Sequence, residues 1–349
     1  MFKWLYEKIE IFKEREIRIF GVPVVQYGQR TLLGGVKERY FRIFHKSLEH
    51  QFLDYILSFI PKEHDYIFLI RCNGLGENYL LNFMIDEMIQ KKGIKNPCFV
   101  SHRDVYRDLF AMWNDIPFYK DPSLSLKHWN EILLHPVYRY KGKTFYVYHT
   151  TLKESQNFLA LNFAPNSDAH YIEHVIKRSG CKIQYKKPRI SDDVITSINE
   201  KTKTLNKKKF VFFVPEAKGT KLLPESFWKD LAENFIKKGY DVFVNTADGI
   251  CNYGKSAKTS LAEMYYLASL SKAIVSIRCG ITEILSPLSV PKHVLYTHYR
   301  CEDVSAEQIL RLTTIKKYPA VKEKTVFEYN TEGEDMDKIS KTIIKGVTK

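Results

Sequence analysis

Twice along its length, the chain runs through the same succession of a short apolar run, a loop, and a longer amphipathic stretch. The first series opens with the apolar run at 65–70, and the second opens with the run at 210–214. After the first run, Leu80, Phe83 and Met84 recur at helical spacing. Because alternating strands and helices form a parallel sheet with helices on its faces, the pattern predicts an α/β protein with two doubly wound domains.

The same pattern of apolar runs and amphipathic stretches predicts the remaining strands and helices. Further strands are expected at 96–101, 143–150, 241–245, 273–277 and 292–296. Helices are expected at 78–92, 103–113, 167–180, 227–239, 260–272 and 334–346. The helix at 260 opens with a capping box from Ser260 to Glu263.

The domain boundary is expected in the polar, charged segment between about 190 and 209. A chain of 349 residues exceeds the size at which single cores stop growing, so two domains are the default. The predicted ranges are an N-terminal extension packed on the first domain at 1–60, a first domain at 61–195, a second domain at 208–330, and a terminal helix at 331–349 that could cross back to the first domain.

The N-terminal extension allows two interpretations. Phe2, Leu5, Ile9 and Phe12 would share one face of a helix, and a hairpin-like stretch follows at 17–30. Such a helix could pack on its own domain, which we favour, or lie on an anionic membrane surface.

The formal net charge of +14 favours an anionic partner. The excess is spread evenly, at +6 over the first 200 residues and +8 over the rest, whereas nucleic-acid binders concentrate their charge; nucleic acid is therefore an improbable partner. Six cysteines without C-x-x-C spacing argue against a zinc site or a disulfide framework and favour reduced thiols. With neither a signal-peptide pattern nor an apolar run long enough to span a bilayer, we expect a cytoplasmic protein that could sit peripherally on the inner face of the membrane.

Three loops that follow predicted strands carry the candidate chemistry. The first holds Asn73, Gly74, Gly76 and Glu77, where the glycines allow close backbone approach and the acid lies at a helix N-terminus. A capped turn between strand and helix would look the same. The third glycine of a dinucleotide-binding fingerprint is missing.

The second loop holds Lys218 and Lys221, two cations between a strand and a helix. Positive charge and free amide groups at that place can bind a diphosphate. A solvated charged loop is the alternative.

The third loop runs from Arg278 through Gly280, Ile281 and Thr282 to Glu283. The amides of the new helix could bind a phosphate, with Arg278 as a fixed cation. The alternative is a capped turn in which Arg278 pairs with a carboxylate.

Together, three segments resemble the heptosyltransferases of glycosyltransferase family 9. IFLIRCNGLGENYLL is similar to that family's opening strand and G-x-G-D loop. KGTKLLPESFWKDLAENFIKKGYDVFVN is similar to its K-R-W-P segment, and TSLAEMYYLASLSKAIVSIRCGITEILSPLSVPKHVLY to its S-L-x-E-L-x-x-L helix and D-S-G-P-x-H turn. The resemblance covers the first strand-loop-helix and about residues 210–296. It implies a GT-B-type fold, with two Rossmann-like domains facing a central cleft.

By this resemblance, Glu77 corresponds to the acidic general base, Lys221 to the donor-phosphate lysine, and Gly280 to the glycine of the donor loop. This sequence departs from the family's pattern at four places. Glu77 stands where the family has Asp, and Lys-Leu-Leu-Pro at 221–224 replaces K-R-W-P. Arg278 stands where the family has an acid, and Glu283 where it has a histidine. For this reason ADP-heptose is not carried over as the donor.

The activity implied is transfer of a sugar, with inversion, from a nucleotide-diphosphate sugar to a hydroxyl of a bacterial surface glycan or lipid-linked acceptor. No metal or cofactor is expected, since no Asp-x-Asp follows a strand and the pair His170 and His174 lacks an acidic partner pattern. The alternatives are a binding protein that keeps the GT-B shell without catalysis, and a sugar-nucleotide epimerase.

Overall fold

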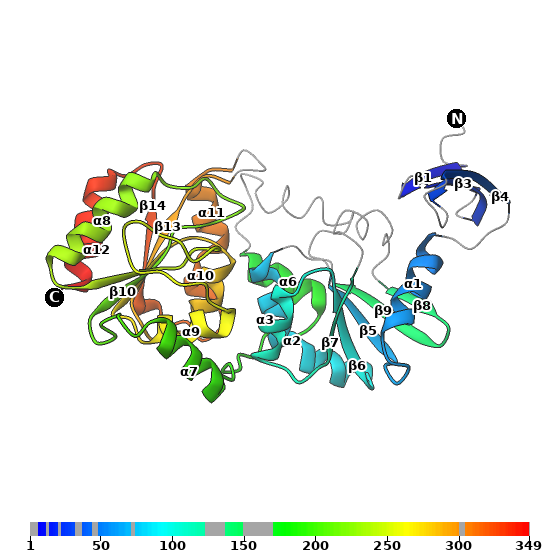
Figure 1. Cartoon of the computed structure of the whole chain (residues 1–349), viewed down its shortest axis with the longest axis horizontal. Coiled ribbons are helices and arrows are strands. Elements are labelled where there is room, and N and C mark those ends of the chain that lie inside the picture. The colour runs from blue at the N-terminus through cyan, green and yellow to red at the C-terminus, as the bar shows by residue number, and fades with distance from the viewer. Residues whose placement is uncertain are drawn as a thin grey trace. The chain divides into compact units, whose positions relative to one another are not determined.

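The computed structural model describes residues 6–11, 14–19, 22–31, 37–43, 48–70, 74–122, 137–148, 170–299 and 304–348 (Figure 1). The described strands form three separate sheets. The chain divides into two compact units that interleave along the sequence. Unit 1 comprises Met1–Asn73, Lys92–Asp104 and Ile116–Lys153, and unit 2 comprises Gly74–Lys91, Val105–Asp115 and Glu154–Lys349. The predicted domain ranges, which are continuous in sequence, stay a prediction.

The N-terminal sheet of unit 1 is antiparallel, with strand order β1-β2-β3-β4. Its strands are β1 (Tyr6–Ile11), β2 (Glu14–Ile19), β3 (Val22–Thr31) and β4 (Lys37–Ile43). The expected hairpin at 17–30 is confirmed by the pairing of β2 with β3. The expected helix through Ile9 is wrong where the structure describes it, because 6–11 is a strand paired with β2. Phe2, Leu5 and Phe12 lie outside the described residues.

The second sheet of unit 1 has the order β7-β6-β5-β9-β8. Its strands are β5 (Tyr66–Ile70), β6 (Pro97–Ser101), β7 (Phe118–Lys120), β8 (Val137–Tyr140) and β9 (Lys143–Tyr148). All pairs are parallel except β8 with β9. Helix α1 (Leu48–Phe59) buries Phe52, Leu53 and Ile56 against this sheet, so this part of the 1–60 extension does pack on the first α/β sheet.

Unit 2 contains a fully parallel sheet with the order β11-β10-β12-β13-β14. Its strands are β10 (Phe210–Val214), β11 (Asp241–Val244), β12 (Ala273–Ile277), β13 (Lys292–Tyr296) and β14 (Val326–Asn330). The four strands predicted from apolar runs, β10 to β13, are confirmed, and β14 is an addition. The chain goes from β10 outward to β11 and then returns to the other side of β10 at β12. The topological switch point is therefore between β10 and β12.

Helices cover both faces of this sheet. In Figure 1, α8 (Glu225–Lys237) and α12 (Met336–Val347) lie on one side, and α9 (Leu261–Ser269), α10 (Gly280–Leu285) and α11 (Ala306–Thr313) lie on the other. Trp228 and Phe235 of α8 and Ile339 and Ile343 of α12 are buried in one core with the strands. The terminal helix thus packs on the parallel sheet of unit 2, whereas the sequence left open a return to the first domain.

The remaining helices also belong to unit 2. They are α2 (Leu75–Lys92, all but its last residue), α3 (Val105–Ala111), α6 (Tyr171–Ser179) and α7 (Asp192–Lys201). The predicted closing glycine of α6 is confirmed, since Gly180 adopts the left-handed conformation with φ 64°. The capping box from Ser260 to Glu263 at the start of α9 is also confirmed.

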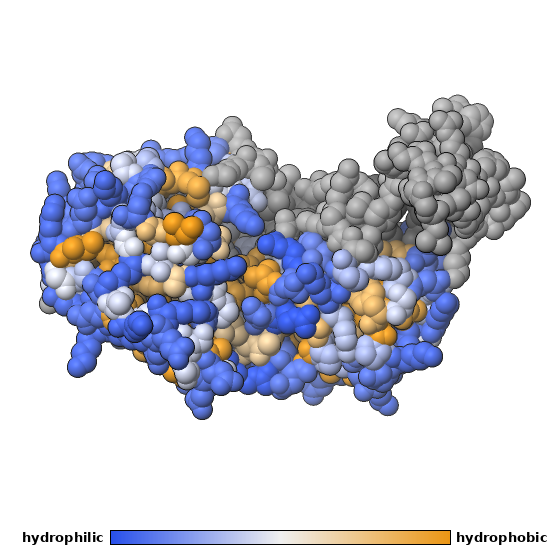
Figure 2. Space-filling view, in the orientation of Figure 1, coloured by the Kyte–Doolittle hydropathy of each residue, from blue (hydrophilic) through white to orange (hydrophobic). Residues whose placement is uncertain are grey.

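The described surface is mostly hydrophilic on the face seen in Figure 2, with apolar residues in scattered patches. Among the helices described, none combines the length and the apolar character that crossing a membrane requires.

Candidate functional site

The carboxyl edge of the parallel sheet of unit 2 brings two of the three predicted loops together. The loop of Lys218 and Lys221 follows β10, and the loop of Arg278 follows β12, its neighbour in the sheet. The two loops therefore flank the topological switch point. In open parallel sheets, ligands bind outside the carboxyl ends of the strands at such a point.

The loop after β10 has its main chain fixed by the loop after β13. The Lys221 N–H donates to the carbonyl of His298 at 2.7 Å, and the Thr297 hydroxyl donates to the carbonyl of Lys221 at 2.7 Å. Thr220 forms a β-bridge with Tyr299. Since β12 lies between β10 and β13, these contacts join the two loops across the end of β12. The side chains of Lys218 and Lys221 are exposed, which leaves both ammonium groups accessible to a ligand.

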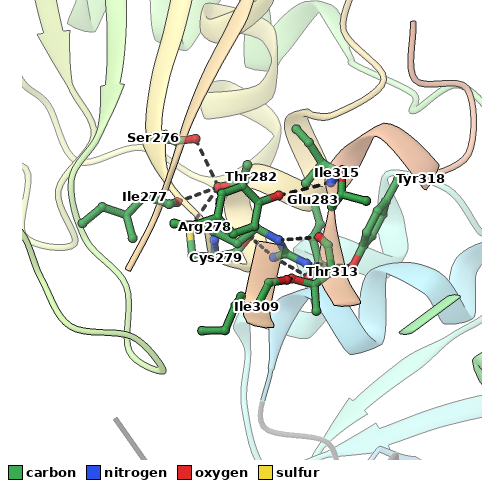
Figure 3. A network of polar contacts seen from close by, with 12 residues as sticks. Ser276, Ile277, Arg278, Cys279, Thr282, Glu283, Ile309, Thr313, Ile315 and Tyr318 are labelled. Carbon is green, nitrogen blue, oxygen red and sulfur yellow. Dashed lines mark hydrogen bonds and ion pairs between the residues drawn. The ribbon is translucent and has the colours of Figure 1, made fainter. Parts of the chain in front are cut away.

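The loop after β12 turns its charges inward. The Arg278 guanidinium forms an ion pair with Glu283, in which Nη1 lies 2.7 Å from Oε1, and both side chains are more than nine-tenths buried. Arg278 also donates to the carbonyls of Thr313 and Cys279 and to the hydroxyl of Tyr318, at 2.9 to 3.2 Å (Figure 3). Burial by itself lowers the pKa of Arg278, but the adjacent Glu283 carboxylate, together with Tyr318 and Tyr296, outweighs it and raises that pKa well above its usual value.

The start of α10 is capped from within. The Thr282 hydroxyl accepts from the Cys279 N–H at 3.2 Å and donates to the Ile277 carbonyl at 2.8 Å. Thr282 is buried, whereas Gly280 and Ile281 are partly exposed. The threonine therefore shapes the turn, and among these residues Gly280 and Ile281 are the ones open to a ligand.

The first predicted loop meets the third. A Cβ atom built on Gly76 would lie 2.0 Å from Glu283 Oε2, and one built on Gly280 would lie 2.7 Å from the Gly76 nitrogen. The first turn of α2 therefore lies against α10 with almost no space between the two main chains. Glu77, partly buried in that turn, directs its carboxylate back toward Gly74, where an added Cβ would lie 3.2 Å from Oε2. Asn73 lies outside the described residues.

Several residues of this region were missed from the sequence. Tyr318 binds Arg278 from 40 positions away, and Tyr299 packs against Gly219, where an added Cβ would lie 3.0 Å from Cε2 of the ring. In unit 1, a separate contact was also missed: Asp121, which follows β7, is buried and accepts a hydrogen bond from the Tyr55 hydroxyl at 2.7 Å. No spacing in the sequence marks these partners, because each contact joins separate elements.

The described residues include no group of three or more His, Cys, Asp and Glu side chains placed to hold a metal ion. Of the histidine pair on the helix at 171–179, His170 caps that helix: Nδ1 accepts from the Ile172 N–H, and Nε2 lies 3.0 Å from the Thr314 carbonyl. The side chain of His174 lies outside the described residues. The expectation that the chemistry needs no metal stays a prediction.

No protein-family model and no curated protein matches the chain. Among solved structures, the chain is similar to the ADP-heptose LPS heptosyltransferase II of E. coli, with 10% identity and a TM-score of 0.49 over 81% of this chain and 98% of that one. It is similar to the glycosyl transferase family 9 protein of Veillonella parvula, with 12% identity and a TM-score of 0.45 over 83% and 93% of the two chains. It is also similar to the E. coli heptosyltransferase WaaC with ADP, with 14% identity and a TM-score of 0.40 over 80% and 98%.

Proposed function

We propose that the chain is a glycosyltransferase that moves a sugar from a nucleotide-diphosphate sugar to a hydroxyl group of a surface glycan or a lipid-linked acceptor, with inversion. The sequence supports this proposal, since the three motifs occur in the order and at the spacing of the family they resemble. The observation that carries it is the contact of Gly76 with Gly280 and Glu283, which brings the Glu77 turn against the loop at the switch point.

In the proposed mechanism, Glu77 is the general base. A carboxylate within hydrogen-bond reach takes the proton of the acceptor hydroxyl as the oxygen attacks the anomeric carbon, an effect worth about 10²–10⁴-fold in rate. At the first turn of α2 the carboxylate is stabilised in its charged form by the helix macrodipole.

The leaving diphosphate takes up negative charge as the bond to the sugar breaks. Lys218 and Lys221 are exposed at the switch point and would neutralise it, together with the main-chain amides of Gly280 and Ile281. Arg278 would act on the phosphates only indirectly, since its three nitrogens already bind groups of the protein. The proposal includes no metal and no cofactor other than the donor.

A second candidate is a binding protein that keeps the fold without catalysis. The buried Arg278–Glu283 pair favours it, because that pair removes two charged side chains from the loop that would meet the donor. The two candidates share a nucleotide site and differ in the need for Glu77.

A thermal-shift screen against nucleoside diphosphates and their sugars tests the shared site. A ligand present at a hundred times its dissociation constant adds about 2.7 kcal/mol to stability. A selective shift by one nucleotide supports the site, and radiolabelled transfer from that nucleotide's sugar to glycolipid acceptors then separates enzyme from binding protein. If no nucleotide shifts the transition, the donor site at the switch point is wrong.

A further inference from the structure

The carboxylate of Glu283 occupies the space that a side chain at position 76 would need. All three nearest atoms to a Cβ built on Gly76 belong to this carboxylate, at 2.0, 2.3 and 2.5 Å. Real Cβ atoms do not approach other heavy atoms so closely. The Glu283 carboxylate can therefore lie against position 76 only because that residue is a glycine. On the facing side, a Cβ on Gly280 would lie 2.9 Å from Cβ of Leu75.

The two oxygens of Glu283 have different surroundings. Oε1 pairs with Arg278, whereas Oε2 is buried without a hydrogen-bond partner among the described residues. Leaving a buried carboxylate oxygen without a hydrogen bond costs free energy unless the local field favours the charge. The positive end of the α2 dipole, at the turn that Oε2 contacts, provides such a field.

Glu283 is also fixed from its other side. Arg278 is held by the Thr313 carbonyl and by Tyr318, which lie in and after α11. The chain of contacts therefore runs from this segment through Arg278 and Glu283 to the first turn of α2. That turn carries Glu77, one residue after Gly76.

We propose that Glu283 is a positioning residue that holds the Glu77 turn of α2 against α10, and that it does not itself contact the donor. The kinetic part of this inference rests on the proposed function. The structural part, direct coupling between positions 76 and 283, does not.

A double-mutant cycle tests the coupling by thermal unfolding. Gly76→Ala places a methyl group inside the Glu283 carboxylate and should lower Tm by several degrees. Glu283→Ala should also lower Tm, because it leaves Arg278 buried without its counter-charge. The combined variant should be no less stable than Glu283→Ala alone, since the carboxylate that the methyl group meets is gone. Additive losses in Tm would overturn the contact.

If Glu283→Ala fails to fold, Glu283→Gln takes its place in the double-mutant cycle. Glutamine keeps the shape of the side chain, so Gly76→Ala should be as harmful in this background as in the unchanged protein. Rescue by Glu283→Gln would contradict the steric argument. Glu233→Gln, on the exposed face of α8, is the matched control and should leave Tm unchanged.

The kinetic test uses Glu283→Gln with the nucleotide sugar found in the screen. A positioning role predicts kcat lower by about tenfold, with the KM of the donor and the affinity for the nucleotide within twofold of the unchanged protein. A raised KM at unchanged kcat would assign Glu283 to donor binding and overturn the proposal. If the unchanged protein transfers no sugar, the proposed function fails, while the Tm cycle still decides the coupling.

Discussion

The ammonium group of Lys201 lies 2.7 and 2.8 Å from the two carboxylate oxygens of Glu263. The same carboxylate accepts from the Ser197 hydroxyl at 2.6 Å and from the Ser260 N–H at 2.8 Å. Glu263 thus caps α9 and binds α7 to it at the same time. Burial by itself raises the pKa of Glu263, but the bonds from Lys201, Ser197 and Ser260 outweigh it and lower that pKa.

Glu263→Ala should therefore destabilise the protein by roughly 2–4 kcal/mol, as expected for loss of a helix cap together with charge-assisted hydrogen bonds. Urea unfolding at pH 7 measures this loss. Because the folded-state pKa is depressed, the stability from the ionised carboxylate is present above the unfolded pKa and is lost as the pH falls through the folded value. The gap between the variant and the unchanged protein should close in acid, and a gap independent of pH would contradict the charge-assisted role.

His293 makes stability depend on pH in the mildly acidic range. Burial lowers the pKa of this histidine to about 4, and its Nδ1 lies 2.9 Å from the Tyr329 hydroxyl. Between that value and the ordinary pKa of about 6.5, the unfolded chain binds more protons, so stability rises with pH. His293→Gln should remove roughly 2 kcal/mol of the difference in unfolding free energy between pH 5 and pH 7.5. An unchanged difference would mean that burial does not lower the pKa of His293 in the folded protein.

Glu77→Gln should lower turnover by about two or more decades and leave nucleotide affinity intact, since the amide cannot take the acceptor's proton. Steady-state kinetics with calorimetric titration of the nucleotide separates the two effects. Glu233→Gln serves as the control for loss of a carboxylate elsewhere. If Glu77→Gln turned over at a near-normal rate, Glu77 would not be the general base, and the alternative of a capped turn at the start of α2 would stand.

Lys221→Ala should weaken nucleotide binding by roughly 1–3 kcal/mol, the range for a lost charge-assisted hydrogen bond. Its Tm should not change, because the main-chain bonds of residue 221 do not need the side chain. Lys229→Ala, an exposed lysine of α8, is the matched control. If Lys221→Ala and Lys229→Ala bind the nucleotide with equal affinity, the loop after β10 is a solvated charged segment and not a diphosphate site.

The apolar runs identified β5, β6 and β9 of the first α/β sheet and β10 to β13 of the unit 2 sheet, because buried parallel strands are short and continuously hydrophobic. The strands at 118–120 and 137–140 were not predicted, since neither contains a buried apolar run. β14 was missed, since Phe327 on this edge strand is exposed and the run is broken by Glu328. The N-terminal segment was misread because Ile9 fits a helical spacing with Phe2, Leu5 and Phe12. The alternation of Ile9 and Ile11 with charged residues, a period of two, was the better guide.

The candidate site was predictable in position but not in its contacts. Loops after strands follow from the α/β pattern, so the region of Lys218 and Gly280 could be found from sequence alone. The sequence offered pairing of Arg278 with an unspecified carboxylate only as an alternative. That Glu283 is this partner depends on Tyr318 and Thr313, which the sequence does not place beside Arg278. The requirement for glycine at 76 has its cause in a carboxylate more than 200 positions away.

The pairing of the loop after β10 with the loop after β13 has a consequence for binding thermodynamics. Through the bonds of Lys221 to His298 and Thr297, the loop that presents both lysines has an ordered main chain before any ligand arrives. Ordering a free loop costs about 1–2 kcal/mol of conformational entropy per residue. In this protein the loop loses that entropy when the chain folds, before any ligand binds. An anion that binds the two ammonium groups therefore binds more tightly than it would to a loop that had to be ordered on binding.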